Sequence, residues 1–129
     1  TLTGTFYEKR GAVYHYALDI PANVHTPVRA VVAGKVVEVG YQYPYANYTR
    51  ENYGNYIKIK DRNGNTWLYA HLQKYIVLDG DKVDEGQVIG GVGWTGLFSC
   101  SPHLHLAKYD GNNRPVFFTK DFGVVWRLR

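Results

Sequence analysis

The chain has 129 residues, of which 45% are hydrophobic and 20% charged, and its formal net charge at pH 7 is +4. The length fits one domain, and the composition excludes a disordered, collagen-like or coiled-coil chain. Neither an apolar run of ~20 residues that could span a membrane nor a basic stripe typical of nucleic-acid binding is present. Residues 1–10 are too polar for a signal peptide, and the absence of methionine leads us to expect a processed product or a fragment whose targeting segment lies elsewhere.

Strand-forming segments follow one another along the chain, and no segment keeps the apolar period of an amphipathic helix over three turns. The expected strands cover residues 28–32, 35–41, 55–60, 66–72, 87–92 and 104–109. Ala33-Gly34 predicts a tight hairpin between the first two strands, and Asn63-Gly64 predicts another between the third and the fourth. We therefore expect one all-β domain over residues 1–129, mainly antiparallel and with little helix.

Two segments outside these strands are rich in aromatic or apolar residues. The longest expected loop, residues 42–52, contains Tyr43, Tyr45 and Tyr48. These tyrosines either pack on one another or form the wall of a binding cleft, because tyrosine offers both stacking surface and a hydrogen bond. The apolar tail after Gly111 is expected to close the core as a last strand or a short turn.

Four of the five histidines stand in surroundings that indicate a site. His15 and Asp19 are four residues apart, which is ~13 Å along an extended strand, so the chain must bend between them if both bind one ion. His103 and His105 point to the same face of a strand, with Cα atoms ~6.6 Å apart. His71 follows at the end of another strand, and His25 is expected to be an ordinary surface residue.

These residues can be combined into one chemical arrangement. Two imidazoles and one carboxylate make a three-ligand zinc site with an open fourth position, and two further imidazoles beside it could carry the acid–base steps of amide hydrolysis. The single cysteine, Cys100, excludes a disulfide scaffold, and we expect it to be a structural thiol rather than a zinc ligand.

Three motifs in order resemble those of the lysostaphin/LytM-type zinc endopeptidases of bacterial cell-wall metabolism. They are H-x-x-x-D at 15–19, Y-x-H-L at 69–72 and H-x-H at 103–105. The connecting segments 26–37, 53–57 and 80–96 are similar too, so that the resemblance covers about residues 11–109. Two positions depart from the usual family pattern, Ala17 in place of Gly and Leu106 in place of Phe, and neither removes a functional group.

The resemblance implies the LytM-like duplicated hybrid motif fold and a role for each motif residue. One zinc ion per chain would be held by His15, Asp19 and His105. His71 and His103 would be the catalytic residues, although the sequence does not settle which of them takes the proton from water.

The remaining expectations concern the surroundings of the zinc. Tyr7 and Tyr14, near His15 in sequence, are candidate oxyanion donors. Tyr43, Tyr45 and Tyr48 are candidate substrate-binding residues in the groove wall.

The function implied is hydrolysis of peptide bonds in the stem peptide or cross-bridge of peptidoglycan. We expect a monomer of bacterial or phage origin that acts outside the cell or in the cell envelope, with no nucleic-acid partner. The main alternative is an inactive LytM-like domain that binds the wall or activates another hydrolase, but all five motif positions are filled. A sugar-phosphotransferase IIA phosphocarrier shares a similar β architecture and an H-x-x-x-D stretch, and the H-x-H motif argues against it.

Overall fold

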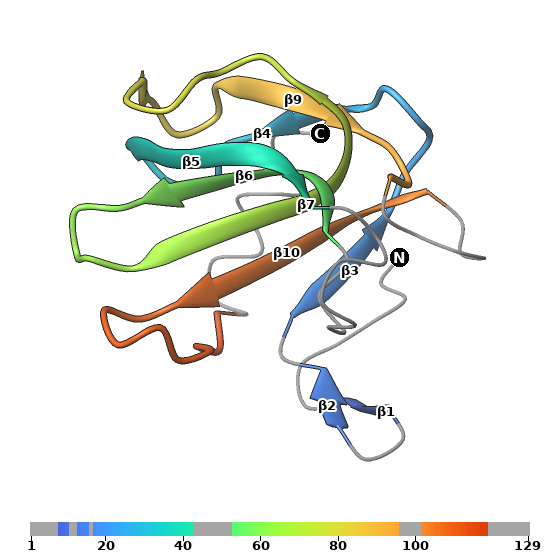
Figure 1. The fold of residues 1–129 in the computed structure, drawn as a ribbon, viewed down its shortest axis with the longest axis horizontal. Coiled ribbons are helices and arrows are strands. Elements are labelled where there is room, and N and C mark those ends of the chain that lie inside the picture. The colour runs from blue at the N-terminus through green and yellow to red at the C-terminus, as the bar shows by residue number, and fades with distance from the viewer. Residues whose placement is uncertain (1–7, 11–12, 16, 43–52, 96–101, 119–129) are drawn as a thin grey trace.

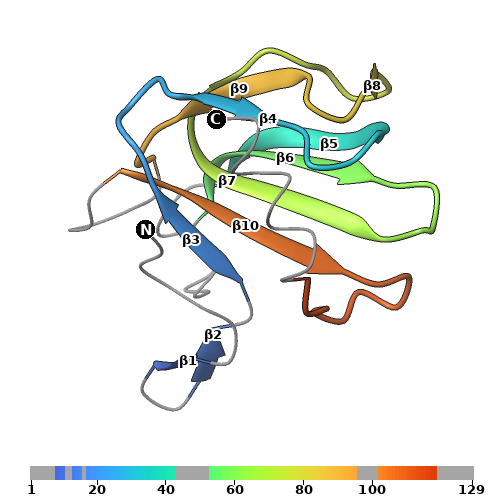
Figure 2. The ribbon, with the colours of Figure 1, turned by 180° about the vertical axis from the view of Figure 1, so that it is seen from behind.

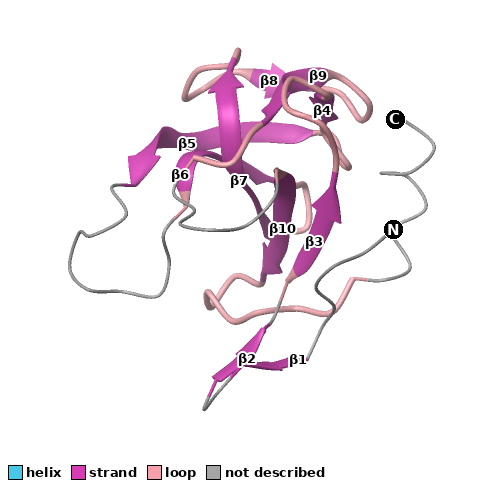
Figure 3. Ribbon diagram, turned by 90° about the vertical axis from the view of Figure 1, so that its right-hand side faces the viewer, coloured by secondary structure: helices cyan, strands magenta, loops and turns pink. Residues whose placement is uncertain are grey.

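The computed structural model describes residues 8–10, 13–15, 17–42, 53–95 and 102–118, with the backbone alone for 8–10 and 13–15. All regular structure in these ranges is β, and Figure 3 shows strands and loops without a helix. The strands are β1 (Glu8–Arg10), β2 (Val13–His15), β3 (Leu18–Pro21), β4 (Pro27–Arg29), β5 (Gly34–Gln42), β6 (Gly54–Lys60), β7 (Thr66–Tyr75), β8 (Lys82–Val83), β9 (Val88–Val92) and β10 (His103–Tyr109). The all-β expectation is confirmed.

The main sheet has the strand order β3-β10-β7-β6-β5-β8, and all its pairs are antiparallel. β9 pairs with both β4 and β7, so that β4 and β9 cover one end of the sheet (Figures 1 and 2). β1 and β2 form a separate two-stranded sheet. The consequence for function is that β3, β10 and β7 lie side by side, and these strands carry Asp19 of the first motif and the whole of the second and third motifs.

The hairpin predicted at Asn63-Gly64 is confirmed. β6 and β7 pair around it, and Gly64 has a φ of 84°, which lies in the left-handed region that favours glycine. The Oδ1 atom of Asp61 accepts hydrogen bonds from the backbone N–H groups of Asn63 and Asn65, and its Oδ2 atom accepts one from the indole of Trp67. One side chain thus ties the turn to the start of β7.

The hairpin predicted at Ala33-Gly34 is wrong. β4 ends at Arg29 and pairs with β9, whereas β5 begins at Gly34 and pairs with β6 and β8. A Cβ atom on Gly34 would lie 2.4 Å from the carbonyl oxygen of Lys60. Glycine is therefore needed here for the close approach of β5 to β6, and the segment between β4 and β5 crosses from one pairing partner to another.

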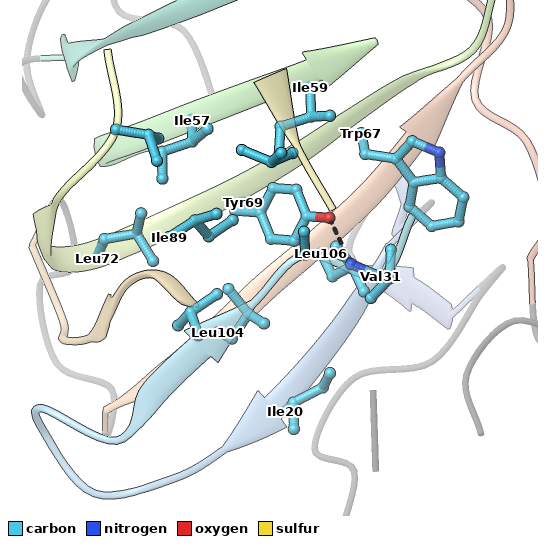
Figure 4. Close-up of a cluster of buried hydrophobic side chains, with 14 of the residues drawn as sticks. Ile20, Val31, Ile57, Ile59, Trp67, Tyr69, Leu72, Ile89, Leu104 and Leu106 are labelled. Carbon is cyan, nitrogen blue, oxygen red and sulfur yellow. Dashed lines mark hydrogen bonds between the residues drawn. The ribbon is translucent and has the colours of Figure 1, made fainter. Parts of the chain in front are cut away.

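The main core lies on one face of the sheet and is centred on β7 (Figure 4). Trp67 and Tyr69 of β7 are almost fully buried there. The Tyr69 hydroxyl accepts a hydrogen bond of 3.0 Å from the backbone N–H of Val31, so the buried phenol has a partner. Phe118 packs edge-on against Trp67 at 5.1 Å between ring centroids. The tail therefore does close the core as far as it is described, through Phe118 and an isolated bridge between Tyr109 and Pro115.

Candidate active site

Strand alternation places the motif residues of β3 and β10 on the face opposite the main core. Leu18 and Ile20 of β3 and Leu104 and Leu106 of β10 belong to the core cluster. Because successive side chains of a strand point to opposite faces, the residues between them share the other face. Asp19, His103 and His105 are the polar residues in these places. A second, small cluster shares this face: Ala17, Leu68, Ala70 and Ala107, with the half-buried Tyr53, Tyr56 and Tyr109 against it.

Strand register brings the carboxylate and the second histidine of H-x-H together. His105 of β10 lies directly opposite Asp19 of β3. Its Nδ1 atom is 3.2 Å from Oδ1 of Asp19, and Nε2 of His103 is 3.6 Å from the same oxygen. Asp19 is only 5% exposed. A buried carboxylate thus faces two imidazoles, as a charge in that position requires.

His71 reaches this face because of a break in the alternation of β7. Trp67 and Tyr69 face the core, and regular alternation would send residue 71 there as well. Instead Leu72 joins the core cluster, and the pairing of β6 with β7 shifts between Asn55 and Ile57. His71 itself has a φ of 62°, an uncommon conformation for a residue other than glycine. This bulge turns the imidazole to the face that carries Asp19 and His105.

The three rings then lie close to one another. The ring centroid of His71 is 5.2 Å from that of His103 and 5.7 Å from that of His105. Burial, followed by the charge of His105, lowers the pKa of His71 to about 4, while its hydrogen bond to Thr95 opposes this. His71 is therefore neutral at pH 7. Its Nδ1 atom lies 2.8 Å from the carbonyl oxygen of Thr95. A carbonyl can only accept, so Nδ1 carries the proton and Nε2 is the acceptor nitrogen.

The two residues of the H-x-x-x-D pair are separated by a bend. β2 ends at His15, a bend follows at Ala17, and β3 begins at Leu18. The side chain of His15 lies outside the described part of the structure. Among the side chains that are described, no group of three or more His, Cys, Asp or Glu residues forms a metal site.

The geometry of the described pair fits a zinc ion. Two atoms at about 2.0–2.1 Å from a tetrahedral zinc lie about 3.3 Å from each other. The distance of 3.2 Å between His105 Nδ1 and Asp19 Oδ1 is close to this value. Both atoms are of the kinds that zinc prefers, and a third such ligand would complete a site with one open position.

Several other predicted residues cannot be compared with the structure. Tyr7, Tyr43, Tyr45, Tyr48 and Cys100 lie outside the described residues, and Tyr14 is described by its backbone alone. Their assigned roles stay predictions. His25 is exposed, as expected for a surface residue.

Sequence reasoning assigned no site role to four residues that contact the histidines or their supports. The ring centroid of Tyr53 lies 6.2 Å from that of His105. Gly54, Asn55 and Thr95 surround the bulge that carries His71. In the sequence, these four residues could be noticed only because segments 53–57 and 80–96 resemble the zinc endopeptidases. That resemblance does not indicate what each residue does.

The sequence model of Peptidase family M23 matches residues 13–117, which include all five motif residues. The chain belongs to peptidase family M23. A member of similar sequence is the glycyl-glycine endopeptidase ALE-1 of Staphylococcus capitis, 43% identical over 96 residues. That match covers 73% of this chain and 24% of ALE-1. The chain thus spans about a quarter of the length of this relative.

Two solved structures are similar to this one. The catalytic domain of the antimicrobial peptidase lysostaphin from Staphylococcus simulans is 34% identical, with a TM-score of 0.68 over 90% of this chain and 78% of that domain. A zinc-containing peptidase from Vibrio cholerae is 32% identical, with a TM-score of 0.74 over 90% of this chain and 35% of that one. The antiparallel sheet described above is the fold that these structures share with this chain.

Proposed function

We propose that this M23 chain is a zinc endopeptidase that hydrolyses peptide bonds in bacterial peptidoglycan. The observation that carries the proposal is the pair formed by His105 Nδ1 and Asp19 Oδ1, 3.2 Å apart, with two further imidazole rings beside it. Two potential ligands and two potential acid–base groups on one face are what metal-assisted amide hydrolysis needs. The names of ALE-1 and of the zinc-containing peptidase support the same reaction class.

One zinc ion per chain would be held by Asp19, His105 and His15. The first two fit by distance and donor type, and the third is the partner that the family resemblance implies. When bound, zinc polarises the scissile carbonyl and lowers the pKa of a coordinated water toward ~7. The remaining chemistry belongs to the side chains.

His71 and His103 divide the proton transfers between them. Nε2 of His71 is an acceptor, because Nδ1 donates to Thr95, so His71 is suited to take the proton of the attacking water. Its lowered pKa keeps this ring neutral, and therefore able to accept, at pH 7. His103, 5.2 Å away between ring centroids, is placed to stabilise the developing oxyanion or to protonate the leaving amine.

The substrate is a short peptide of the bacterial cell wall. A chain that acts on this substrate works outside the cell or in the cell envelope. The described part of the structure holds no helix long and apolar enough to cross a membrane. Two kinds of bond are candidates, those of a glycine cross-bridge and those of the stem peptide. ALE-1, as its name states, cleaves between glycines.

The proposal is tested by digesting purified cell walls with the zinc-loaded protein and identifying released peptides by mass spectrometry. The wild type should release peptides with new amino termini. His71→Ala and His103→Ala should each keep zinc and lose about 10²–10⁴-fold in rate, the usual effect of removing an acid–base group. His25→Ala, at an exposed position, is the matched control and should keep the wild-type rate. Binding to walls without any released peptide would show instead an inactive binding module.

A further inference from the structure

Thr95, just after β9, touches two segments that are distant in sequence. Its hydroxyl oxygen accepts a hydrogen bond of 3.0 Å from the backbone N–H of Asn55 and donates one of 2.7 Å to the carbonyl oxygen of Leu72. Its own carbonyl oxygen faces Nδ1 of His71 at 2.8 Å. One residue therefore joins the start of β6, the bulge of β7 and the imidazole ring.

Asn55 closes the same network from the other side. Its side-chain amide donates hydrogen bonds of 3.1 Å to the carbonyl oxygens of Leu72 and Gln73. The backbone N–H of His71 is held in turn by the carbonyl oxygen of Tyr53 at 2.7 Å. His71 and the two residues that follow it are thus fixed by Tyr53, Asn55 and Thr95.

Gly54 makes the close approach of these segments possible. A Cβ atom at this position would lie 2.3 Å from both the carbonyl carbon and the carbonyl oxygen of Thr95, and 2.5 Å from its hydroxyl. Gly54 also has a φ of 60°. The backbone of β6 therefore lies in close contact with the Thr95 carbonyl group, which accepts the hydrogen bond from His71. This contact limits the positions that the carbonyl oxygen can take.

We propose that Thr95 is a positioning residue that fixes the orientation and tautomer of His71, with Asn55 as its support. The proposal rests on the assignment of His71 as an acid–base group. The Thr95 hydroxyl, bonded on both sides, anchors the peptide whose carbonyl keeps the proton on Nδ1 of His71. Nε2 then always faces the reacting groups as an acceptor. Without the anchor, the ring is free to rotate or to move its proton from Nδ1 to Nε2. A protonated Nε2 can no longer accept the proton of the attacking water.

The decisive variants are Thr95→Val, which keeps the shape and removes the hydroxyl, and Thr95→Ser, which restores it. Thr95→Val should lower kcat by about 10–100-fold, the usual effect of removing a group that orients an active-site ligand or base, with little change in KM. Thr95→Ser should recover most of the kcat. Thr66→Val, at the other end of β7, is the matched control and should leave kcat unchanged.

A spectroscopic readout separates positioning from mere support of the fold. The ¹⁵N shifts of the His71 ring in the zinc-loaded wild type should show a protonated Nδ1 and an unprotonated Nε2. In Thr95→Val they should move toward the other tautomer or an average of the two. The wild-type spectrum tests the proposal even if Thr95→Val does not fold.

The outcomes are distinguishable from failure of the proposed function. An Nε2-protonated ring in the wild type, an unchanged kcat in Thr95→Val, or a Thr95→Ser variant no better than Thr95→Val would each overturn the positioning role. A wild type that releases no peptide from cell walls, yet shows the Nδ1-protonated ring that shifts in Thr95→Val, would overturn the hydrolase and leave the anchoring of His71 intact.

Discussion

At the scale of single residues, the carboxylate of Asp19 is the part of the H-x-x-x-D motif whose surroundings best fit a metal ligand. It is buried, it lies on the face opposite the core, and its Oδ1 atom is within 4 Å of two imidazole nitrogens. A buried charge in such a place needs a compensating charge, and a divalent cation supplies one without requiring either histidine to be protonated.

Replacing Asp19 tests its role as a ligand. Asp19→Ala leaves two neutral imidazoles, so zinc should be lost on dialysis against a chelator that leaves the wild type loaded. Metal content per chain, measured by atomic spectroscopy, gives the answer. Asp84→Ala, at an exposed position, is the control and should keep its zinc. Full zinc occupancy in Asp19→Ala after the same dialysis would remove Asp19 from the ligand set.

The shared face of His103 and His105 was predictable from the sequence, but the residues that hold the motif side chains in place were not. The i, i+2 spacing of His103 and His105 predicts a shared face, and the structure confirms it. The role proposed for Thr95 combines a hydroxyl that anchors the peptide with a backbone carbonyl that faces His71, and every residue has such a carbonyl. Its importance appears only when the left-handed conformation of His71 brings Nδ1 to that oxygen.

At the scale of elements, the bulge in β7 determines which residues face the site. A strand without it would direct His71 into the core and Leu72 to the site face, because a shift of one residue exchanges the two faces. The shift in pairing and the positive φ at His71 reverse this. Strained backbone of this kind costs energy and is retained where the surrounding contacts hold it.

Gly54→Ala tests how tightly that bulge is held. The added methyl group meets the Thr95 carbonyl at 2.3 Å, and alanine also disfavours a φ of 60°, so we expect a loss of about 2–5 kcal/mol in the free energy of unfolding. Gly64→Ala is the matched control, since its φ is 84° but nothing lies within 4 Å of the new Cβ atom. It should cost about 1–2 kcal/mol. Urea denaturation measures both, and equal losses would show that the contact with Thr95 carries no energy.

Turn signals predicted one hairpin and misled at the other. Asn63-Gly64 has a specific turn chemistry, with a positive φ at Gly64 and a capping carboxylate at Asp61. Gly34 is needed for contact with the Lys60 carbonyl, which sequence cannot distinguish from a need for a turn. β7 continues to Tyr75, beyond the end predicted at residue 72, and this extension also depends on contacts with a distant strand. Its last residues pair with the glycines of β9, and a Cβ on Gly90 would meet the Lys74 carbonyl at 2.5 Å.

At the scale of the whole molecule, one sheet separates the core from the site. β7 supplies Trp67 and Tyr69 to the core face and, after the bulge, His71 to the other face. The all-β class was predictable from the run of strand segments and glycines, and the family from three motifs in order. The pairing of β4 with β9 was not, because pairing between distant strands depends on contacts that local patterns do not encode.

Tyr69→Phe tests the polar contact inside the core. The change keeps the ring and removes the acceptor of the Val31 N–H, which then stays buried without this hydrogen bond. We expect a loss of about 1–3 kcal/mol in the free energy of unfolding, with zinc content unchanged. Thermal unfolding of the zinc-loaded protein measures it. A variant as stable as the wild type would show that the Val31 N–H finds another partner.

The tyrosines of loop 42–52 are predicted to contact the wall polymer away from the reacting bond. Tyr43→Ala or Tyr45→Ala should then reduce the rate on intact cell walls more than on a short soluble peptide, with unchanged zinc content, because such contacts mainly affect affinity. The rates of both variants on both substrates decide the matter. Near-wild-type rates on both would show that the loop is structural.

Hydrolysis is proposed to depend on one zinc ion held by His15, Asp19 and His105. The most direct measurement is the rate at which new amino termini appear in purified cell walls, before removal of metal by a chelator, after it, and after titration with zinc. The rate should fall to background when the metal is removed and return fully at one zinc per chain. A metal-free protein that releases amino termini at the original rate would contradict it.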